Sequence, residues 1–161
     1  MSVRECVQCA AATRKGPRCK KNTCMYSEFC AVHTKSIFDL ALKPSRIPGS
    51  GTGLFTTVAI PKNKNIAKYT GVIKSKTAYN ENPSGYGVAL SRGRVLDAAS
   101  TQSGVARYVN SCRAANKRAG HCSGNNAKFV VNNRTDSVWV RAIKNIPAGS
   151  EIFMSYGAGY W

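Results

Sequence analysis

Apolar residues in this chain occur in short runs, and no long segment repeats them with a helical period. The runs are rich in β-branched and aromatic residues, and Gly, Pro, Asn and Ser separate them. This pattern is typical of short strands, so it predicts a mostly β domain made of several small β-sheets. The expected strands lie within residues 54–60, 65–73, 86–90, 94–99, 128–133, 138–143 and 151–156.

The pattern changes near residue 36. Before this point the chain contains cysteines and many Lys and Arg residues, but little aliphatic material. Residues 36–43 (SIFDLALK) predict one or two helical turns, and residues 44–53 are rich in Gly and Pro. A length of 161 residues allows one domain with a real core and a small appendage. We therefore expect a Cys-rich module at 1–36, a linker at 37–46 and a larger domain at 47–161.

The Cys-rich segment has the spacing C-x2-C-x9-C-x4-C-x5-C-x2-H. The chain has seven cysteines, an odd number, and their local clustering beside a histidine favours a metal site over a disulfide scaffold. Zinc takes four thiolate or imidazole ligands, and close pairs provide two ligands from one tight turn. Metal binding would also stabilise a segment too small and polar to fold unaided. The candidate zinc ligands are Cys6, Cys9, Cys19, Cys24, Cys30 and His33.

Six candidates exceed the four positions of one zinc ion, so either two are spare thiols or the site holds more than one ion. The pattern C-x3-T-x2-G-x2-C followed by C-x2-H resembles a small module of viral and phage proteins. That resemblance implies the set Cys9, Cys19, Cys30 and His33. A compact alternative replaces Cys9 with Cys24, and free thiols on a disordered arm are a further interpretation.

Charge indicates the kind of partner. Lys and Arg number 24 against 7 Asp and Glu, which gives a formal charge of +17. Such an excess favours polyanions, so we expect contact with nucleic acid or a nucleosome, although a merely solubilising surface is the alternative. No apolar run is long enough to cross a bilayer, and the N-terminus lacks the apolar region of a secretory signal. These features predict no membrane contact and a nuclear or cytoplasmic location, which would include a host nucleus if the protein is viral.

Four motifs follow one another in the larger domain: GSGTGLFT, KYTGVI, LDAASTQSGVARYVNSC and IPAGSEIFMSYG. The G-x-G is not a dinucleotide fingerprint, because no βαβ unit follows it. In this order and spacing the motifs resemble the SET domain, the family of S-adenosylmethionine-dependent protein lysine methyltransferases, from about Ile47 to Trp161. The resemblance implies a SET-domain fold of several small β-sheets with a C-terminal pseudoknot, preceded here by the zinc-stabilised module.

The resemblance also assigns roles to residues. The glycine turn would lie against the methionine part of S-adenosylmethionine, and Asn110 would anchor the cofactor with its side chain. Tyr156 matches the catalytic tyrosine of the family, and Tyr86 matches an aromatic residue of the lysine channel. The implied cofactor-binding residues are Gly51, Thr52, Gly53, Leu54, Phe55, Arg107, Tyr108, Asn110, Tyr156 and Trp161.

The chemistry of methyl transfer explains these residue types. A neutral lysine amine attacks an activated methyl group in line, so the protein mainly positions two reactants and excludes water. Aromatic walls hold the lysine stem and favour a cation nearby. His121, in a Gly- and Asn-rich loop, is the only histidine of this domain, so we expect the amine proton to leave through water.

The chain departs from the family pattern in two motifs, and one departure is the Y-x-G-Glu motif, which appears here as YTGV. The Asn-His-Ser-Cys string of the family appears here as Asn110, Ser111 and Cys112 without a histidine, which predicts a rearranged cofactor pocket. An unusual insert, RAANKRAGHCSGNNAKF, follows directly, and Cys112 and Cys122 are expected to be structural or free. The apolar half of residues 106–112 (ARYVNSC) is expected to be a core strand that runs into this pocket.

The function predicted from these features is methylation of a lysine on a histone or another chromatin-associated protein. A strongly basic enzyme repels a Lys-rich peptide, so bridging by DNA, a less basic target and automethylation all stay open. Met154 stands at the position that tunes the number of methyl groups in the family. The alternative is a zinc-dependent nucleic-acid-binding adaptor with a catalytically inactive SET fold.

Overall fold

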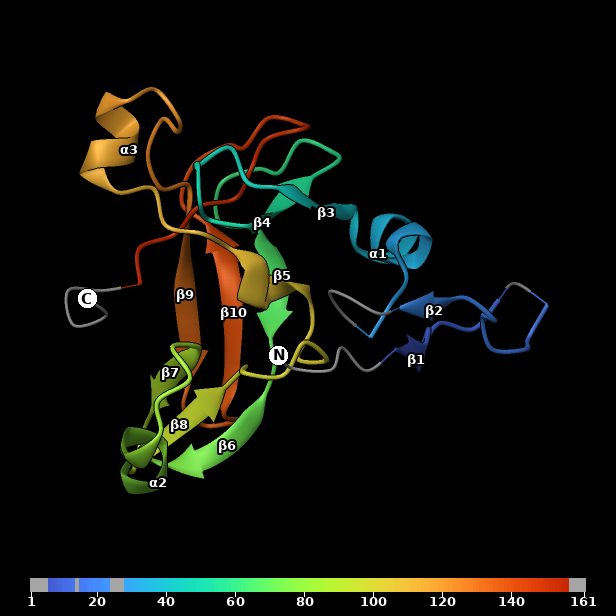
Figure 1. The fold of residues 1–161 in the computed structure, drawn as a ribbon, viewed down its shortest axis with the longest axis horizontal. Coiled ribbons are helices and arrows are strands. Elements are labelled where there is room, and N and C mark those ends of the chain that lie inside the picture. Colours follow the sequence, from blue (N-terminus) through green and yellow to red (C-terminus); the bar gives the residue numbers. More distant parts are fainter. Residues whose placement is uncertain (1–5, 14, 24–27, 157–161) are drawn as a thin grey trace.

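The computed structural model describes residues 6–13, 15–23 and 28–156. It confirms a mostly β protein made of small sheets with few helices. Figure 1 shows β9 and β10 side by side in the larger body, with β6, β7, β8 and α2 gathered at one end and α3 at the other. The first two strands and α1 lie to one side of this body. None of the helices in the described ranges is long and apolar enough to span a bilayer.

The N-terminal module is held by few elements. Strand β1 (Val7–Gln8) pairs with β2 (Asn22–Thr23) in an antiparallel ladder. Helix α1 (Ala31–Phe38) begins directly after Cys30 and ends at Asp39, which adopts the left-handed conformation with φ 55°. The helix therefore runs across residue 36, where the composition changes.

The expectation of helix over residues 36–43 is wrong in its second half. Strand β3 (Leu40–Pro44) follows Asp39 directly and pairs along its whole length with β4 (Thr52–Thr56). Pairing with a neighbouring strand outweighs the weak local preference of such a short segment. The predicted linker at 37–46 thus contains a strand that pairs with the glycine motif of the larger domain.

Two three-stranded antiparallel sheets complete the body. In the first, β10 (Ser137–Ala142) lies between β5 (Asn65–Tyr69) and β9 (Ala127–Asn132). In the second, β8 (Arg94–Asp97) lies between β6 (Val72–Ser75) and β7 (Gly87–Leu90), with α2 (Lys76–Glu81) connecting β6 to β7. Alternate residues of β10 face the core, as the period of a strand requires, and Val138, Val140 and Ala142 are at most 1% exposed.

The segment expected to be a core strand before Asn110 is instead a 3₁₀ helix, η1 (Val105–Tyr108). Gly104 leads into it with φ 81°, and the Val109 amide closes it on the Ala106 carbonyl at 3.3 Å. Burial was predicted correctly, since Ala106 and Val109 are almost completely buried. The strand assignment was wrong because this segment finds no ladder partner over its length, and a short helical turn satisfies its backbone locally.

The segment 151–156 makes isolated bridges instead of a regular strand. It bridges β4 at Phe55–Glu151, the chain just after η1 at Asn110–Phe153, and β9 at Ala127–Met154. The Met154 amide donates to the Asn110 carbonyl at 2.9 Å. This crossing brings the C-terminal tyrosine segment beside Asn110.

The insert after Cys112 is a distinct element of the fold. It contains the short helix α3 (Ala114–Arg118), which has no buried residue, and Figure 1 shows it at the outer edge of the body. Cys112 and Cys122 form a disulfide that closes this loop, with their Cα atoms 6.0 Å apart. Of the two expectations for this pair, the structural one is the one observed.

Candidate active site

Tyr156 lies between two cavities. The first, here called the aromatic cavity, is small, with a volume of about 40 Å³. The second, here called the polar cavity, has a volume of about 300 Å³. Tyr156 lines both of them, and its hydroxyl donates a hydrogen bond to the Val109 carbonyl. The aromatic cavity is lined by Tyr69, Gly85, Tyr86, Gly87, Val88, Arg107, Val109, Phe129, Met154 and Tyr156, and the polar cavity by Ile47, Pro48, Gly49, Ser50, Asn110, Ser111, Arg113, Asn116 and Tyr156.

Contacts between strands fix the walls of the aromatic cavity. The rings of Tyr69 and Phe129 meet edge to face with centroids 4.9 Å apart. The Tyr69 hydroxyl donates to the Tyr86 carbonyl at 2.9 Å. The Arg107 guanidinium lies 4.1 Å from the Tyr86 ring centroid, and its Nε donates to the Ala98 carbonyl at 2.8 Å. Aromatic side chains with polar groups at the rim suit an alkyl chain that ends in an amine.

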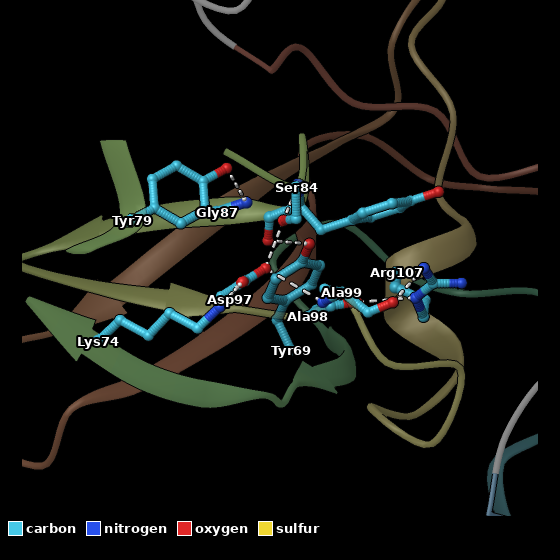
Figure 2. A network of polar contacts seen from close by, with 10 residues as sticks. Tyr69, Lys74, Tyr79, Ser84, Gly87, Asp97, Ala98, Ala99 and Arg107 are labelled. Atoms are coloured by element: carbon cyan, nitrogen blue, oxygen red, sulfur yellow. Dashed lines mark hydrogen bonds and ion pairs between the residues drawn. The ribbon is translucent and has the colours of Figure 1, made fainter. Parts of the chain in front are cut away.

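The buried carboxylate of Asp97 supports the loop before Tyr86 (Figure 2). Asp97 is 2% exposed and accepts hydrogen bonds from Lys74 Nζ at 2.7 Å, from the Ser84 hydroxyl and from the Ala99 amide at 3.1 Å. Burial by itself would raise the pKa of Asp97, but the Lys74 and Ser84 hydrogen bonds and the Lys74 charge outweigh it and lower the pKa below its ordinary value. The carboxylate therefore stays ionised and joins β8 to the loop that positions Tyr86.

A second buried carboxylate supports the polar cavity. Glu151 is 2% exposed and accepts from the Ser45 hydroxyl at 2.7 Å and from the Arg46 amide at 2.8 Å. The Asn110 side-chain amide donates to the Thr52 carbonyl at 3.2 Å and to Glu151 Oε1 at 3.4 Å. These bonds hold the Asn110 side chain at one end of the cavity, against the first residue of β4.

Gly53 allows this arrangement. A Cβ at Gly53 would lie 2.2 Å from Glu151 Oε1 and 3.3 Å from the Ser45 backbone. No side chain fits there while the carboxylate keeps its position. The glycine of the G-x-G motif is thus required by the close approach of Glu151.

The structure brings together only part of the predicted cofactor set. Asn110 and Tyr156 line the polar cavity. Of the predicted glycine turn at 51–53, only Thr52 hydrogen-bonds to Asn110, and none of its three residues lines the cavity. Leu54 and Phe55 are buried in β4, and Tyr108 packs against the core. Arg107 lines the aromatic cavity together with Tyr86, whereas Trp161 lies outside the described residues.

Sequence reasoning missed several lining residues. Tyr69 and Phe129 line the aromatic cavity from β5 and β9, and no local motif marks them as a pair. Arg113 and Asn116 line the polar cavity from the insert. The unusual length of this insert, directly after Asn110, was the one signal that could have indicated them.

The N-terminal module gathers four candidate metal ligands. The ligand atoms of Cys9, Cys19, Cys30 and His33 all lie within 4.8 Å of one another. The three thiols are at most 6% exposed, and His33 Nδ1 lies 3.3 Å from Cys30 Sγ and 3.5 Å from Cys9 Sγ. Ligands of one tetrahedral zinc are roughly 3.5 Å apart, so this donor set fits a zinc ion. Cys6 is exposed and outside this group, and Cys24 lies outside the described residues.

The thiols of this group differ in acidity. Burial would raise the pKa of Cys9, but hydrogen bonds to its sulfur, including one from the Cys30 amide at 3.3 Å, lower the pKa to about 7. Burial and the neighbouring Cys9 sulfur raise the pKa of Cys30, although a hydrogen bond with His33 acts against them. Three buried cysteines and one histidine are a typical ligand set of a structural zinc site.

The sequence matches the SET domain family over residues 51–157. The chain therefore belongs to the SET domain family, as the motif resemblance predicted. The Cys/His group in front of this domain is consistent with a zinc module.

Solved structures show the same fold. One is described as ctPRC2 in an autoinhibited conformation bound to S-adenosylmethionine, with a TM-score of 0.59 and 26% identity over 74% of this chain. Another is a humanized mutant of the Chaetomium thermophilum Polycomb Repressive Complex 2 bound to the inhibitor GSK126, with a TM-score of 0.57 and 27% identity over 73% of this chain. In each case the match covers only 15% of the longer chain. Among curated protein sequences, none matches the chain significantly.

Proposed function

We propose that the protein is an S-adenosylmethionine-dependent protein lysine N-methyltransferase that acts on a histone or another chromatin-associated protein. The observation that supports this most is the position of Tyr156, which lines both cavities. A methyltransferase must bring two substrates together from opposite sides, and one residue between two sites can position both. Similarity to the S-adenosylmethionine-bound ctPRC2 structure supports the same cofactor.

The polar cavity fits the cofactor in size and chemistry. A volume of about 300 Å³ lies at the lower end of the range for small-molecule sites. Its lining joins the turn at Pro48–Ser50 to Asn110 and Ser111. When bound, S-adenosylmethionine supplies an activated methyl group. In this proposal Asn110 holds the cofactor, and Gly49 in the turn that lines the cavity permits its close approach.

The aromatic cavity is proposed to receive the lysine. Tyr86, Tyr69 and Phe129 would hold the alkyl stem, and the Tyr156 hydroxyl and the Val109 carbonyl would face the amine. These residues would hold a neutral amine in line with the methyl group that bound S-adenosylmethionine would supply. The amine proton leaves to water before attack. The Arg107 guanidinium, which lines the same cavity, disfavours a second cation there and so favours the neutral amine.

Two further parts of the proposal concern the metal and the partner. Zinc bound by Cys9, Cys19, Cys30 and His33 would stabilise the N-terminal module. The +17 charge supports contact with nucleic acid or a nucleosome, since the few carboxylates include Asp97 and Glu151, which are buried. Nucleic acid that carries a chromatin protein would also offset the repulsion between this chain and a basic substrate.

Calorimetric titration with S-adenosylmethionine tests the proposal directly. A methyltransferase should bind it saturably and gain thermal stability in its presence. Absence of binding together with salt-dependent DNA binding would instead support the nucleic-acid-binding adaptor with an inactive SET fold.

A further inference from the structure

The loop closed by the disulfide, residues 112–122, forms part of the wall of the polar cavity. It begins two residues after Asn110, and it contributes Arg113 and Asn116 to the lining. The turn at Pro48–Ser50 belongs to the same lining. The cavity thus has a second wall that the family motifs do not include.

The disulfide connects both walls. Cys112 is 7% exposed and clusters with Ile47 and Phe153, and Cys122 packs against the same cluster. Ile47 directly precedes the turn at Pro48–Ser50 and itself lines the cavity. The disulfide therefore packs against Ile47, next to the turn at Pro48–Ser50, and it also closes the loop at 112–122.

Helix α3 adds little packing to the loop. Helix α3 has only five residues, and none of them is buried. The His121 amide donates to the Asn116 carbonyl at 3.0 Å within the loop, and the Cys112 amide donates to the Asn125 side chain at 2.9 Å at its base. A helix without buried residues has no packing of its own, so its position depends on closure of the loop.

We propose that the disulfide loop is part of the cofactor site. Arg113 offers a guanidinium for the carboxylate of S-adenosylmethionine, and Asn116 offers an amide to its polar groups. The Cys112–Cys122 bond positions both residues, so the affinity for the cofactor depends on the state of this bond. This inference rests on the proposed function.

The bond also makes cofactor affinity sensitive to reductants. A dithiol opens the disulfide by exchange: Cys112 and Cys122 become two thiols, and the dithiol becomes a disulfide. Without the disulfide, Arg113 and Asn116 are no longer held in position before the cofactor binds. Binding must then order the loop, which lowers the affinity. The reduced protein keeps the fold of the sheets, because the disulfide lies outside the two three-stranded sheets.

Cofactor affinity of full-length variants tests the inference. The double variant Cys112→Ser/Cys122→Ser removes this bond and leaves Cys9, Cys19 and Cys30 unchanged. Calorimetry with S-adenosylmethionine should give a Kd about tenfold higher than that of the oxidised wild type. Arg113→Ala and Asn116→Ala should also weaken binding, whereas Lys117→Ala, in the same helix but outside the lining, should not.

Each outcome is decisive. Folded double and Arg113→Ala variants with the Kd of the wild type would overturn the inference and leave the proposed function standing. Lack of saturable binding by the oxidised wild type would overturn the proposed function and this inference with it. If the double variant does not fold, the comparison of Arg113→Ala and Asn116→Ala with Lys117→Ala decides alone, and equal affinities would reject the inference.

Discussion

The hydroxyl of Tyr156 donates a hydrogen bond to the main-chain carbonyl of Val109. The two residues are 47 positions apart, and the bond from the Met154 amide to the Asn110 carbonyl holds their segments together. Val109 is 1% exposed, so its carbonyl belongs to a fixed part of the core. The phenol is therefore held at the junction of the two cavities before any ligand arrives.

Replacing Tyr156 with Phe should lower the rate of methyl transfer by about 100-fold. The ring and its packing remain, while the hydroxyl that faces the reacting groups is lost. Binding of S-adenosylmethionine should stay within about twofold of the wild type, because Asn110 and the turn are unchanged. Single-turnover rates and calorimetry on the same preparations separate the two effects. A variant that transfers methyl groups as fast as the wild type would show that Tyr156 has no such role.

The close approach of Gly53 to Glu151 predicts a coupling between these residues. Gly53→Ala places a methyl group 2.2 Å from Glu151 Oε1, so we expect the free energy of unfolding to fall by about 1–3 kcal/mol. In a Glu151→Ala background the same substitution should cost less, because the carboxylate is gone. Urea unfolding of the four proteins gives the coupling energy. Additive costs would mean that the clash at Glu151 is not what requires a glycine here.

The lowered pKa of Asp97 should make the free energy of unfolding decrease at acid pH. Its pKa is lower in the folded protein than in the unfolded chain, so the unfolded state binds the proton more tightly. The contribution of Asp97 is thus fully present above the unfolded pKa of about 4 and is lost as the pH falls through the folded value.

Asp97→Asn should remove that part of the pH dependence and cost about 1–3 kcal/mol at neutral pH, since Lys74 and Ser84 lose a charged acceptor. Thermal unfolding at several pH values between about 2 and 7 measures both effects, with the wild type followed in parallel. An Asp97→Asn variant whose stability falls with acid as steeply as that of the wild type would contradict this account.

The Cys/His group predicts one zinc ion per chain at this site. Cys19→Ser and His33→Ala should each lose most of the bound zinc, because a tetrahedral site with three ligands binds it much more weakly. Cys112→Ser is the matched control, since Cys112 lies in the disulfide loop and should leave the zinc content unchanged. Elemental analysis of the purified proteins measures the content. Equal zinc in the wild type and in Cys19→Ser would exclude this ligand set.

Most of the strands could be predicted from the sequence, because runs of β-branched and aromatic residues express a local preference. The SET family could be predicted because its motifs keep their order along the chain, and the family match confirms it. The 3₁₀ helix at Val105–Tyr108 could not be predicted from the sequence, because its apolar residues are typical of a strand. It is helical only because this segment has no neighbouring strand with which to pair.

The composition of the site was only partly predictable. Asn110 and Tyr156 lie in motifs, whereas Tyr86 stands outside them. Tyr69 belongs to the KYTGVI motif, but its contact with Phe129 arises only from the pairing of β5 and β9 with β10. Likewise, Arg113 and Asn116 reach the polar cavity because a disulfide closes their loop, and two cysteines alone do not reveal their pairing. Contacts of this kind depend on tertiary structure, which local sequence does not encode.

Lysine methylation by this protein can be measured as transfer of a labelled methyl group. The protein is incubated with labelled S-adenosylmethionine and with histones, free and assembled on DNA, and every protein present is analysed by mass spectrometry, including the enzyme itself. Label should appear on lysine side chains of a histone with wild-type protein and should be strongly reduced with Tyr156→Phe. Saturable cofactor binding with no label on any lysine, or equal labelling by the two proteins, would contradict the proposed function.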